Sequence, residues 1–302
     1  MKIAVTGASG LIGGALLPAL RGDGHEVIQL VRRTPRTAEE HRWDPQHHRI
    51  DPSVLADVDA VVNFAGAPIR PRPFTRGYKE RLLASRLDAT TTISEALAAA
   101  ATGDPGRPRV LLSASAVGYY GDTGSRTVTE TDPAGADFLA QVCEQWEAAT
   151  AAAETAGIRV VHLRTGLVLD RSAMLVQVLG TVFRFGLGGR MGNGRQYWPW
   201  ISLDDEIGAI RHLLTADVSG PVNLTGPSPV TNADFTRELG RQLHRPTPLP
   251  VPAIALTLAL GEFGRSSVVG GQRAVPIRLQ ESGYEFAHVD LASALRAALS
   301  KK

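Results

Sequence analysis

The sequence predicts an α/β fold: a doubly wound parallel sheet followed by a smaller α/β lobe. The first half of the 302-residue chain alternates short apolar runs with longer stretches of helical periodicity. Strands that alternate with helices of this length form a parallel sheet covered on both faces. At the N-terminus, the apolar run at residues 3–6 leads directly into a glycine-rich segment and then a helical pattern. Together these observations predict a sheet of the Rossmann type.

Strands and helices are expected to alternate as far as residue 163. Strands are predicted at residues 3–6, 26–31, 60–64, 109–113 and 160–163. Helices are predicted between them at residues 11–21, 75–101 and 136–156. In the last of these, apolar residues recur at spacings of three and four, which gives the helix one face that packs on the core.

The glycine-rich segment after the first strand has the spacing of a dinucleotide-binding turn. Gly7 permits a tight turn, Gly10 lets the backbone approach phosphates, and Gly13 lets helix and strand pack closely. Free N–H groups and the positive end of the helix dipole then face the anion. A purely structural turn is the alternative, but the strand-to-helix context favours a nucleotide. The turn residues expected to contact it are Gly7, Ser9, Gly10, Leu11, Ile12 and Gly13.

The end of the second predicted strand indicates which dinucleotide binds. Sites that prefer NAD place an acidic residue there, which accepts a hydrogen bond from the ribose 2′-hydroxyl. Here the strand ends in Arg32 and Arg33 with no carboxylate in reach, and two guanidinium groups can hold a 2′-phosphate. The alternative is a pair of solvated arginines. The pattern favours NADP over NAD. Trp43, Asp44 and Pro45 are expected to border the adenine, and the alternative is that Trp43 belongs to the edge of the core.

After about residue 165 a glycine-rich loop and short helices replace the regular alternation of strands and longer helices, and we place a domain boundary there. Residues 1–165 are predicted to form the nucleotide-binding domain and residues 166–302 a smaller substrate lobe. The lobe is expected to contain a glycine-rich loop at 186–194, short helices at 204–215 and 231–243, and a strand at 222–225. It should pack over the carboxyl edge of the sheet, where ligands bind in such folds. A return of the chain to the main sheet is left open.

Composition and charge exclude several classes of protein. The chain is 43% hydrophobic and 21% charged with a formal net charge of +2, so no basic surface calls for nucleic acid. The single cysteine, Cys143, excludes an internal disulfide and a cysteine-rich zinc site. No apolar run is long enough to cross a bilayer. The pattern of the first residues predicts a strand and not a signal peptide. We expect a cytoplasmic globular protein without metal, nucleic acid or membrane partners, whose oligomeric state stays open.

Segments along nearly the whole chain resemble the extended short-chain dehydrogenase/reductases, the group that contains the sugar-nucleotide epimerases. The main matches are residues 7–13, 63–66, 113–121 and 163–169. Further matches at residues 67–69, 85–86, 119–120, 143–147, 192–196 and 283–286 make the chain similar to the atypical branch often called epimerase family proteins. The resemblance implies further cofactor contacts at Ala65, Gly66, Ser85, Arg86, Ser113, Thr165, Gly166 and Leu167. For Arg86 the alternative is a salt-bridge residue. One departure is Ser202, where this branch is expected to carry a histidine.

The usual catalytic pair of the wider family is missing. That family moves a proton with a tyrosine whose pKa is lowered by a lysine four residues later on the same helix. The tyrosines lie at positions 78, 119, 120, 197 and 284, and none has a lysine at that distance. The helix register instead puts Cys143 and Glu147 at the two positions. A carboxylate has the wrong charge to stabilise a phenolate, and it makes the neighbouring thiol a poor proton shuttle.

Other residues are therefore candidates for the proton chemistry. Ser115 can hydrogen-bond a substrate oxygen, or it can cap the backbone at a strand end. Of Tyr119 and Tyr120, one should face the nicotinamide pocket as a proton donor and the other should be packed. Glu147 is a second candidate, as a general base whose pKa is raised by burial. The alternative for Glu147 is a surface glutamate beside Trp146.

The lobe carries arginines and tryptophans that are expected to rim a substrate pocket. Arg190, Arg195, Trp198 and Trp200 favour an anionic, partly flat substrate such as a nucleotide-linked sugar, although such a cluster can equally staple two lobes together. The leading hypothesis is an NADP(H)-binding oxidoreductase or epimerase-like enzyme that transfers hydride at a carbonyl or carbinol carbon. The alternative is a non-catalytic NADP(H) sensor or scaffold.

Overall fold

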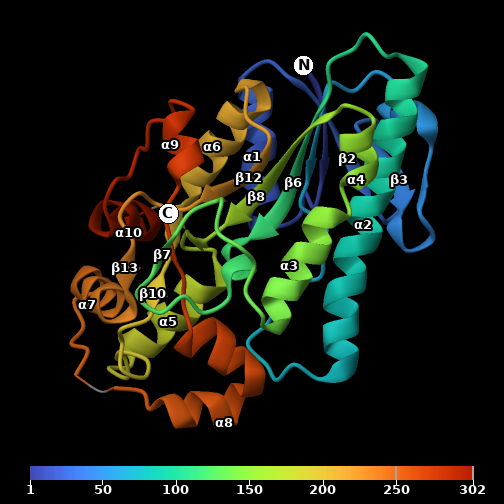
Figure 1. The fold of residues 1–302 in the computed structure, drawn as a ribbon. Helices are drawn as coiled ribbons and strands as arrows, with labels where there is room; N and C mark the ends of the chain where they lie inside the picture. Colours follow the sequence, from blue (N-terminus) through green and yellow to red (C-terminus); the bar gives the residue numbers. More distant parts are fainter. Residues whose placement is uncertain (249, 301–302) are drawn as a thin grey trace.

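The computed structural model describes residues 1–248 and 250–300, and its centre is an eight-stranded sheet with helices on both faces (Figure 1). The strands lie in the order β12, β8, β6, β5, β1, β2, β3, β4. All neighbours pair in parallel except β3 and β4. The bounds are β1 (Lys2–Thr6), β2 (Glu26–Val31), β3 (Glu40–Asp44), β4 (Arg49–Ile50), β5 (Ala60–Asn63), β6 (Val110–Ala116), β8 (Arg159–Thr165) and β12 (Gly220–Leu224).

The central strands are apolar along their whole length because both faces of the sheet are covered. In β1, Ile3 and Val5 belong to the core shared with α1 (Leu11–Gly22) and α6 (Leu203–Thr215). Ala4, between them, belongs to the core shared with α2 (Arg76–Gly103) and α4 (Ala151–Thr155). Successive side chains of a strand point to opposite faces, so one short run supplies both cores. The predicted Rossmann-type sheet is confirmed.

The helix predicted over residues 136–156 is interrupted. It consists of α3 (Phe138–Ala148) and α4, and the two are separated near Thr150. The hydroxyl of Thr150 donates to the carbonyl oxygen of Glu147 at 2.7 Å. A threonine hydroxyl that bonds to nearby backbone competes with continued helix. The break turns the chain toward β8.

The smaller lobe has its own core and lies at the carboxyl edge of the main sheet (Figure 1). Its short strands pair as β9 (Leu167–Leu169) with β11 (Trp200–Ser202) and β10 (Tyr197–Trp198) with β13 (Val230–Thr231). The helices are α5 (Met174–Arg184), α7 (Asn232–Gln242), α8 (Ala253–Phe263), α9 (Ile277–Glu281) and α10 (Leu291–Ser300). A further pair, β7 (Thr127–Val128) and β14 (Arg273–Ala274), ties the lobe to the first half of the chain.

The chain returns to the main sheet before it ends. Strand β12, which falls within the lobe in sequence, pairs with β8, and α6 packs beside α1 on the sheet. The possibility left open by the sequence is therefore realised, while the division into two domains after residue 165 stays a prediction. Among the residues described, none of the helices is long and apolar enough to cross a membrane.

Candidate functional site

A cleft of about 630 Å³ lies where β1, β2 and β5 end. The turn after β1, the end of β2 and the loop after β5 form its walls, and α2 contributes from one side. Parallel strands bring these three ends to the same edge of the sheet, which is where doubly wound folds bind ligands. The predicted cofactor residues that line the cleft are Gly7, Ser9, Gly10, Arg32, Arg33, Ala65, Gly66 and Ser85.

The glycine turn has the geometry that a pyrophosphate requires. Gly7 has a φ of +63°, and a Cβ there would lie 2.7 Å from the Phe64 carbonyl oxygen. A Cβ at Gly13 would lie 2.5 Å from the Gly7 carbonyl oxygen, so helix and turn can meet only at glycine. Gly10 caps α1 without a side-chain hydrogen bond. The first amides of the helix, at Leu11, Ile12 and Gly13, therefore have no intrahelical acceptor and can bind an anion.

The two arginines at the end of β2 differ in their partners. Glu40, at the start of β3, accepts from Arg33 at 2.7 Å (Nη1 to Oε2) and 2.5 Å (Nη2 to Oε1). These bonds, with one from the Arg36 amide, lower the pKa of Glu40 to about 2. The prediction that no carboxylate is in reach is wrong, because pairing of Gln29 with Glu40 brings β3 alongside. Arg32 lines the cleft and makes no ion pair or hydrogen bond with any described residue.

Residues on β3 and its flank meet the cleft beside the end of β2. Trp43 is 3% exposed and packs in the core, and it also lines the cleft, while a contact with the adenine stays a prediction. Asp44 does not line the cleft; its Oδ2 lies 2.8 Å from Nδ1 of His47, which lowers the pKa of the Asp44 carboxyl. A contact between Asp44 and a cofactor stays a prediction.

Arg86 supports the loop after β5 instead of lining the cleft. Its guanidinium is buried over the Trp146 ring at 4.8 Å and donates to the carbonyl oxygens of Ala67 (3.1 Å) and Leu82 (3.0 Å). The hydroxyl of Ser85, which does line the cleft, accepts from the Ala67 amide at 2.9 Å. The two residues therefore fix the loop that carries Gly66.

The remaining cofactor candidates lie at the ends of β6 and β8, outside the lining of the cleft. Ser113 is 1% exposed, and its hydroxyl has no partner among the described residues. Thr165 donates to Oε1 of Glu206 at 2.9 Å. The amide of Leu167 donates to the Pro199 carbonyl at 2.7 Å. The neighbouring Gly166 leaves no room for a Cβ against that carbonyl. Their roles toward a cofactor stay predictions.

A buried polar network occupies the sheet edge beside the cleft. Its centre is Glu147 on α3, one helical turn after Cys143. Arg164, at the end of β8, donates to both Glu147 oxygens at 2.8 Å, and Ser115, at the end of β6, donates to Oε1 at 2.6 Å. Arg164 is 2% exposed and Ser115 5%. The helix position of the usual lysine therefore carries no cation. A cation is supplied instead by Arg164 on β8, which pairs with the Glu147 carboxylate at that position.

The general-base hypothesis for Glu147 is wrong, and so is the surface alternative. Burial alone raises the pKa of this carboxyl, but hydrogen bonds from Arg164, His162 and Ser115 outweigh burial and hold it at about 2. Glu147 is therefore ionised and engaged on both oxygens, and its role is to hold Arg164. The thiol of Cys143 is buried, which raises its pKa to about 12 and removes it from proton transfer near neutral pH.

The two tyrosines after β6 differ in burial and in hydrogen bonding, and which of them faces a nicotinamide stays a prediction. Tyr120 is 3% exposed; its hydroxyl donates to Asn223 Oδ1 at 2.7 Å and accepts from Arg164 Nη1 at 3.0 Å. Burial raises the pKa of Tyr120 to about 12. Tyr119 is partly exposed, and its ring lies under the Arg164 guanidinium, 3.4 Å from ring centroid to Cζ. Its hydroxyl has no hydrogen-bond partner among the described residues and is free for a ligand.

Sequence reasoning missed the importance of Arg164 and its neighbours. His162 Nδ1 lies 3.6 Å from Glu147, and the buried Glu130 accepts from the Asn223 amide at 3.1 Å. A signal was present in the strand itself. Arg164 belongs to a strand that is covered on both faces of the sheet, so its side chain is buried, and a buried charge requires a partner. Its partner lies on another element, so the sequence does not name it.

The predicted rim of the substrate pocket is not formed. Trp198 and Trp200 are 5% and 1% exposed and pack with Phe235 inside the core of the smaller lobe, so they neither rim a pocket nor join two lobes. Arg195 is exposed, and Arg190 lines a pocket in the lobe that is separate from the cleft. Packing in this core is enough to explain the two tryptophans on either side of Pro199.

Ser202 caps α6 where a histidine was expected. Its hydroxyl accepts from the Asp205 amide at 2.9 Å and donates to Asp205 Oδ2 at 2.6 Å. His288, from the C-terminal segment, brings its Nδ1 to 3.1 Å from the Ser202 hydroxyl. An imidazole is therefore present beside this position, although it comes from another part of the chain.

Comparison with known proteins agrees with this geometry. Residues 3–225 match the NAD dependent epimerase/dehydratase family, and residues 251–298 match a domain of unknown function, DUF1731. An epimerase family protein of Mycobacterium leprae is 45% identical over 99% of this chain and 96% of its own length. The crystal structure of human epimerase family protein SDR39U1 with NADPH is 30% identical, with a TM-score of 0.84 and 99% of both chains covered.

A second solved structure extends the likeness. It is described as a nucleoside-diphosphate sugar epimerase from Corynebacterium glutamicum, 35% identical with a TM-score of 0.81, and the likeness covers 99% of this chain and 58% of that one. The family match covers well over half of the chain and includes the glycine turn, the cleft and the Glu147–Arg164 network. This chain belongs to the NAD dependent epimerase/dehydratase family.

Proposed function

We propose that this chain binds NADPH in the cleft and acts as an oxidoreductase or epimerase-like enzyme on a carbonyl or sugar-nucleotide-like substrate. The observation that carries the proposal is the unpartnered Arg32 beside the free amides at the start of α1. Together they provide one cation for a 2′-phosphate and a helix terminus for a pyrophosphate. The NADPH in the structure of the human relative supports this choice over NAD.

Binding divides among residues with separate tasks. The amides after Gly10 would hold the pyrophosphate, and Arg32 would hold the 2′-phosphate. Arg33 is oriented by Glu40 and would present its remaining N–H groups from a fixed position. A pair of this kind neutralises one of the two arginines, so discrimination between NADP and NAD would depend chiefly on Arg32.

The chain's own residues would handle the proton. When bound, the reduced nicotinamide supplies hydride to a carbonyl carbon. The free hydroxyl of Tyr119 would give its proton to the carbonyl oxygen, and the Arg164 cation against the ring would stabilise the negative charge left on Tyr119. Ser115 would accept a hydrogen bond from the alcohol that forms, because its own proton is donated to Glu147. Glu147 acts only by positioning Arg164 and Ser115.

Titration of the purified protein with NADPH and NADH, followed by nicotinamide fluorescence, tests the binding step. Oxidation of bound NADPH by a panel of aldehydes, ketones and nucleotide-linked ketosugars tests the chemistry. We expect tighter binding of NADPH, and turnover that Tyr119→Phe abolishes while cofactor affinity stays unchanged. Failure to bind either coenzyme would refute the proposal.

A second candidate is a non-catalytic NADP(H) sensor or scaffold. It is favoured by one observation: the helix position of the usual lysine carries an ionised glutamate that is fully engaged. Tight NADPH binding without turnover on the whole substrate panel, in wild type and in Tyr119→Phe alike, would select this alternative. The small anionic substrate, the cytoplasmic location and the division into two domains remain predictions.

A further inference from the structure

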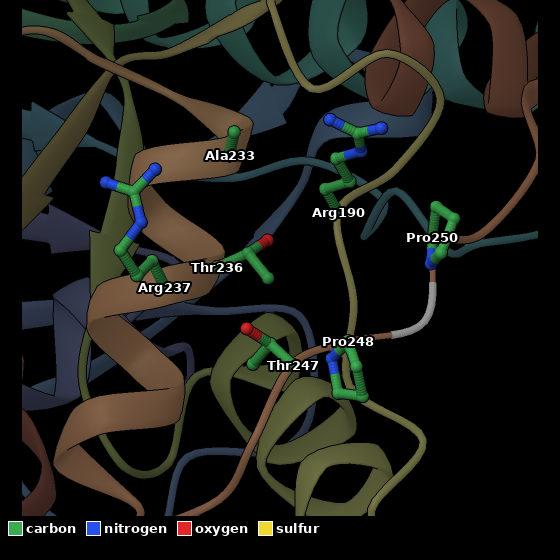
Figure 2. Close-up of a pocket in the computed structure, with 7 residues that line it drawn as sticks. All are labelled: Arg190, Ala233, Thr236, Arg237, Thr247, Pro248 and Pro250. Atoms are coloured by element: carbon green, nitrogen blue, oxygen red, sulfur yellow. The ribbon is translucent and has the colours of Figure 1, made fainter.

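A second pocket, of about 280 Å³, opens in the smaller lobe, away from the cofactor cleft (Figure 2). We call it the α7 pocket, because α7 forms one wall and the chain around Arg190 forms the opposite one. Its lining residues are Arg190, Ala233, Thr236, Arg237, Thr247, Pro248 and Pro250. It shares no lining residue with the cleft, and neither the proposed function nor the family match assigns it a role.

The walls of the α7 pocket are fixed by backbone hydrogen bonds. The Arg190 carbonyl accepts from the Val251 amide at 2.8 Å, and the Val251 carbonyl accepts from the Gly192 amide at 2.8 Å. A Cβ at Gly240 would lie 2.5 Å from Cγ2 of Thr247, so a glycine there lets the Thr247 segment lie directly against α7. These contacts hold the Arg190 and Thr247 walls of the pocket in place.

The pocket presents two hydroxyl groups, each of which can donate or accept a hydrogen bond. Thr236 is 6% exposed, and its hydroxyl makes no hydrogen bond with any residue that the structure describes. Figure 2 shows this hydroxyl directed into the space between α7 and Arg190. A hydroxyl that faces the pocket and has no protein partner is available to a ligand oxygen. The Thr247 hydroxyl points into the same space (Figure 2).

Two arginines supply the charge. The guanidinium of Arg190 has no ion-pair partner among the described residues, and a guanidinium can only donate. Arg237 is held by Asp234 at 3.0 Å, and that carboxylate also accepts from Thr231 at 2.6 Å. The start of α7 adds no free donor, because the Asn232 and Ala233 amides donate to the carbonyls of Gln196 (2.8 Å) and Gly194 (3.0 Å) and the Asp234 amide donates to the Thr231 hydroxyl (3.2 Å). Two arginines and two hydroxyls, opposed by one engaged carboxylate, favour an anion.

We propose that the α7 pocket binds a phosphate group, either free phosphate or the phosphate of a small phosphomonoester. Arg190 and the Thr236 hydroxyl donate to its oxygens, and Arg237, which lines the pocket but is held by Asp234, adds positive charge from α7. Guanidinium groups and hydroxyls match phosphate oxygens in geometry and charge. The volume is at the lower end for small-molecule sites, which fits a phosphate with a short organic substituent and excludes a dinucleotide.

The test is calorimetric titration of the full chain with inorganic phosphate, glycerol 3-phosphate and glycerol at constant ionic strength. Arg190→Gln removes the free cation, and Thr236→Val removes the hydroxyl while keeping the shape. Arg195→Gln is the matched control, because Arg195 is an exposed arginine in the same loop and does not line the pocket. Arg32→Gln reports phosphate that binds in the cofactor cleft instead.

We expect both phosphates to bind, and glycerol not to bind. Arg190→Gln should weaken binding about tenfold or more, and Thr236→Val several-fold, as expected for hydrogen bonds to a charged group. Arg195→Gln and Arg32→Gln should leave it unchanged. Tighter binding of glycerol 3-phosphate would identify a phosphomonoester as the ligand, and equal binding would identify free phosphate. No binding to wild type, or binding that Arg32→Gln abolishes and Arg190→Gln spares, would overturn the proposal.

Discussion

The Glu147–Arg164 pair gives a sharp quantitative prediction for Glu147→Gln. The substitution keeps the size of the side chain but leaves Arg164, which is 2% exposed, without its counter-charge. Breaking a buried ion pair by removing one partner costs about 3–5 kcal/mol. The pKa of Glu147 gives an independent figure. Its fall from 4.5 to about 2 corresponds to roughly 3 kcal/mol of folding free energy. The two routes agree, so we expect the variant to be destabilised by about 3 kcal/mol at pH 7.

The pH dependence of this effect has a definite sign. A carboxyl whose pKa is depressed by folding contributes its stability above the unfolded value, near 4.5, and loses it as the pH falls toward 2. Glutamine does not titrate. The difference between wild type and Glu147→Gln should therefore be constant from pH 7 to pH 5.5 and shrink by about 1 kcal/mol by pH 3.5.

Urea unfolding, followed by circular dichroism at pH 7, 5.5 and 3.5, measures that difference. Glu144→Gln is the matched control, since Glu144 is exposed on the same helix and the charge change is identical. Its unfolding free energy should stay within about 0.5 kcal/mol of wild type. The reasoning is refuted if Glu147→Gln is no less stable than Glu144→Gln, or if its deficit is the same at pH 3.5 as at pH 7.

Three further predictions concern single side chains. Arg32→Gln should weaken NADPH binding about tenfold or more and leave NADH binding unchanged in fluorescence titrations, whereas Arg42→Gln, an exposed control on β3, should change neither. Tyr120→Phe should lower the free energy of unfolding by about 1–3 kcal/mol, since it strands Asn223 and Arg164, and an equal loss in Tyr119→Phe would contradict the assignment. Burial raises the pKa of Glu206 to about 8, so the folded state holds a proton that the unfolded state releases above about pH 4.5. Glu206→Gln should therefore gain stability over wild type by about 1.4 kcal/mol per unit between pH 5 and 8 in urea titrations, and a flat difference would count against a buried, protonated Glu206.

The fold and the cofactor turn were predictable because their signals are local. An apolar strand, a glycine that needs positive φ and a helix start are adjacent in sequence, and each constrains the next. The same locality explains the error in the helix predicted over residues 136–156, since its apolar stripe continues past Thr150. The break depends on the bond from the Thr150 hydroxyl to a backbone carbonyl, which competes with a pattern that remains helical.

The polar chemistry was predictable only in part. The absence of the tyrosine–lysine pair follows from the residues alone, and so does the placement of Cys143 and Glu147 on one helix face. The ionisation state of Glu147 does not follow from the residues alone. Burial raises its pKa and Arg164, which comes from another element, lowers it. From the sequence, Tyr120 is a candidate proton donor. In the structure its hydroxyl donates to Asn223, a residue of β12 far away in sequence.

By itself, the sequence determined the parallel sheet, the glycine turn and the lack of the usual catalytic pair, because strand periodicity and backbone conformation are properties of neighbouring residues. Only the tertiary structure decided which charges meet. Glu40 reaches Arg33 across adjacent strands, Arg164 reaches Glu147 from strand to helix, and the α7 pocket joins a loop to a helix. Coulomb interactions depend on distance in space and on burial, and the chain order records neither.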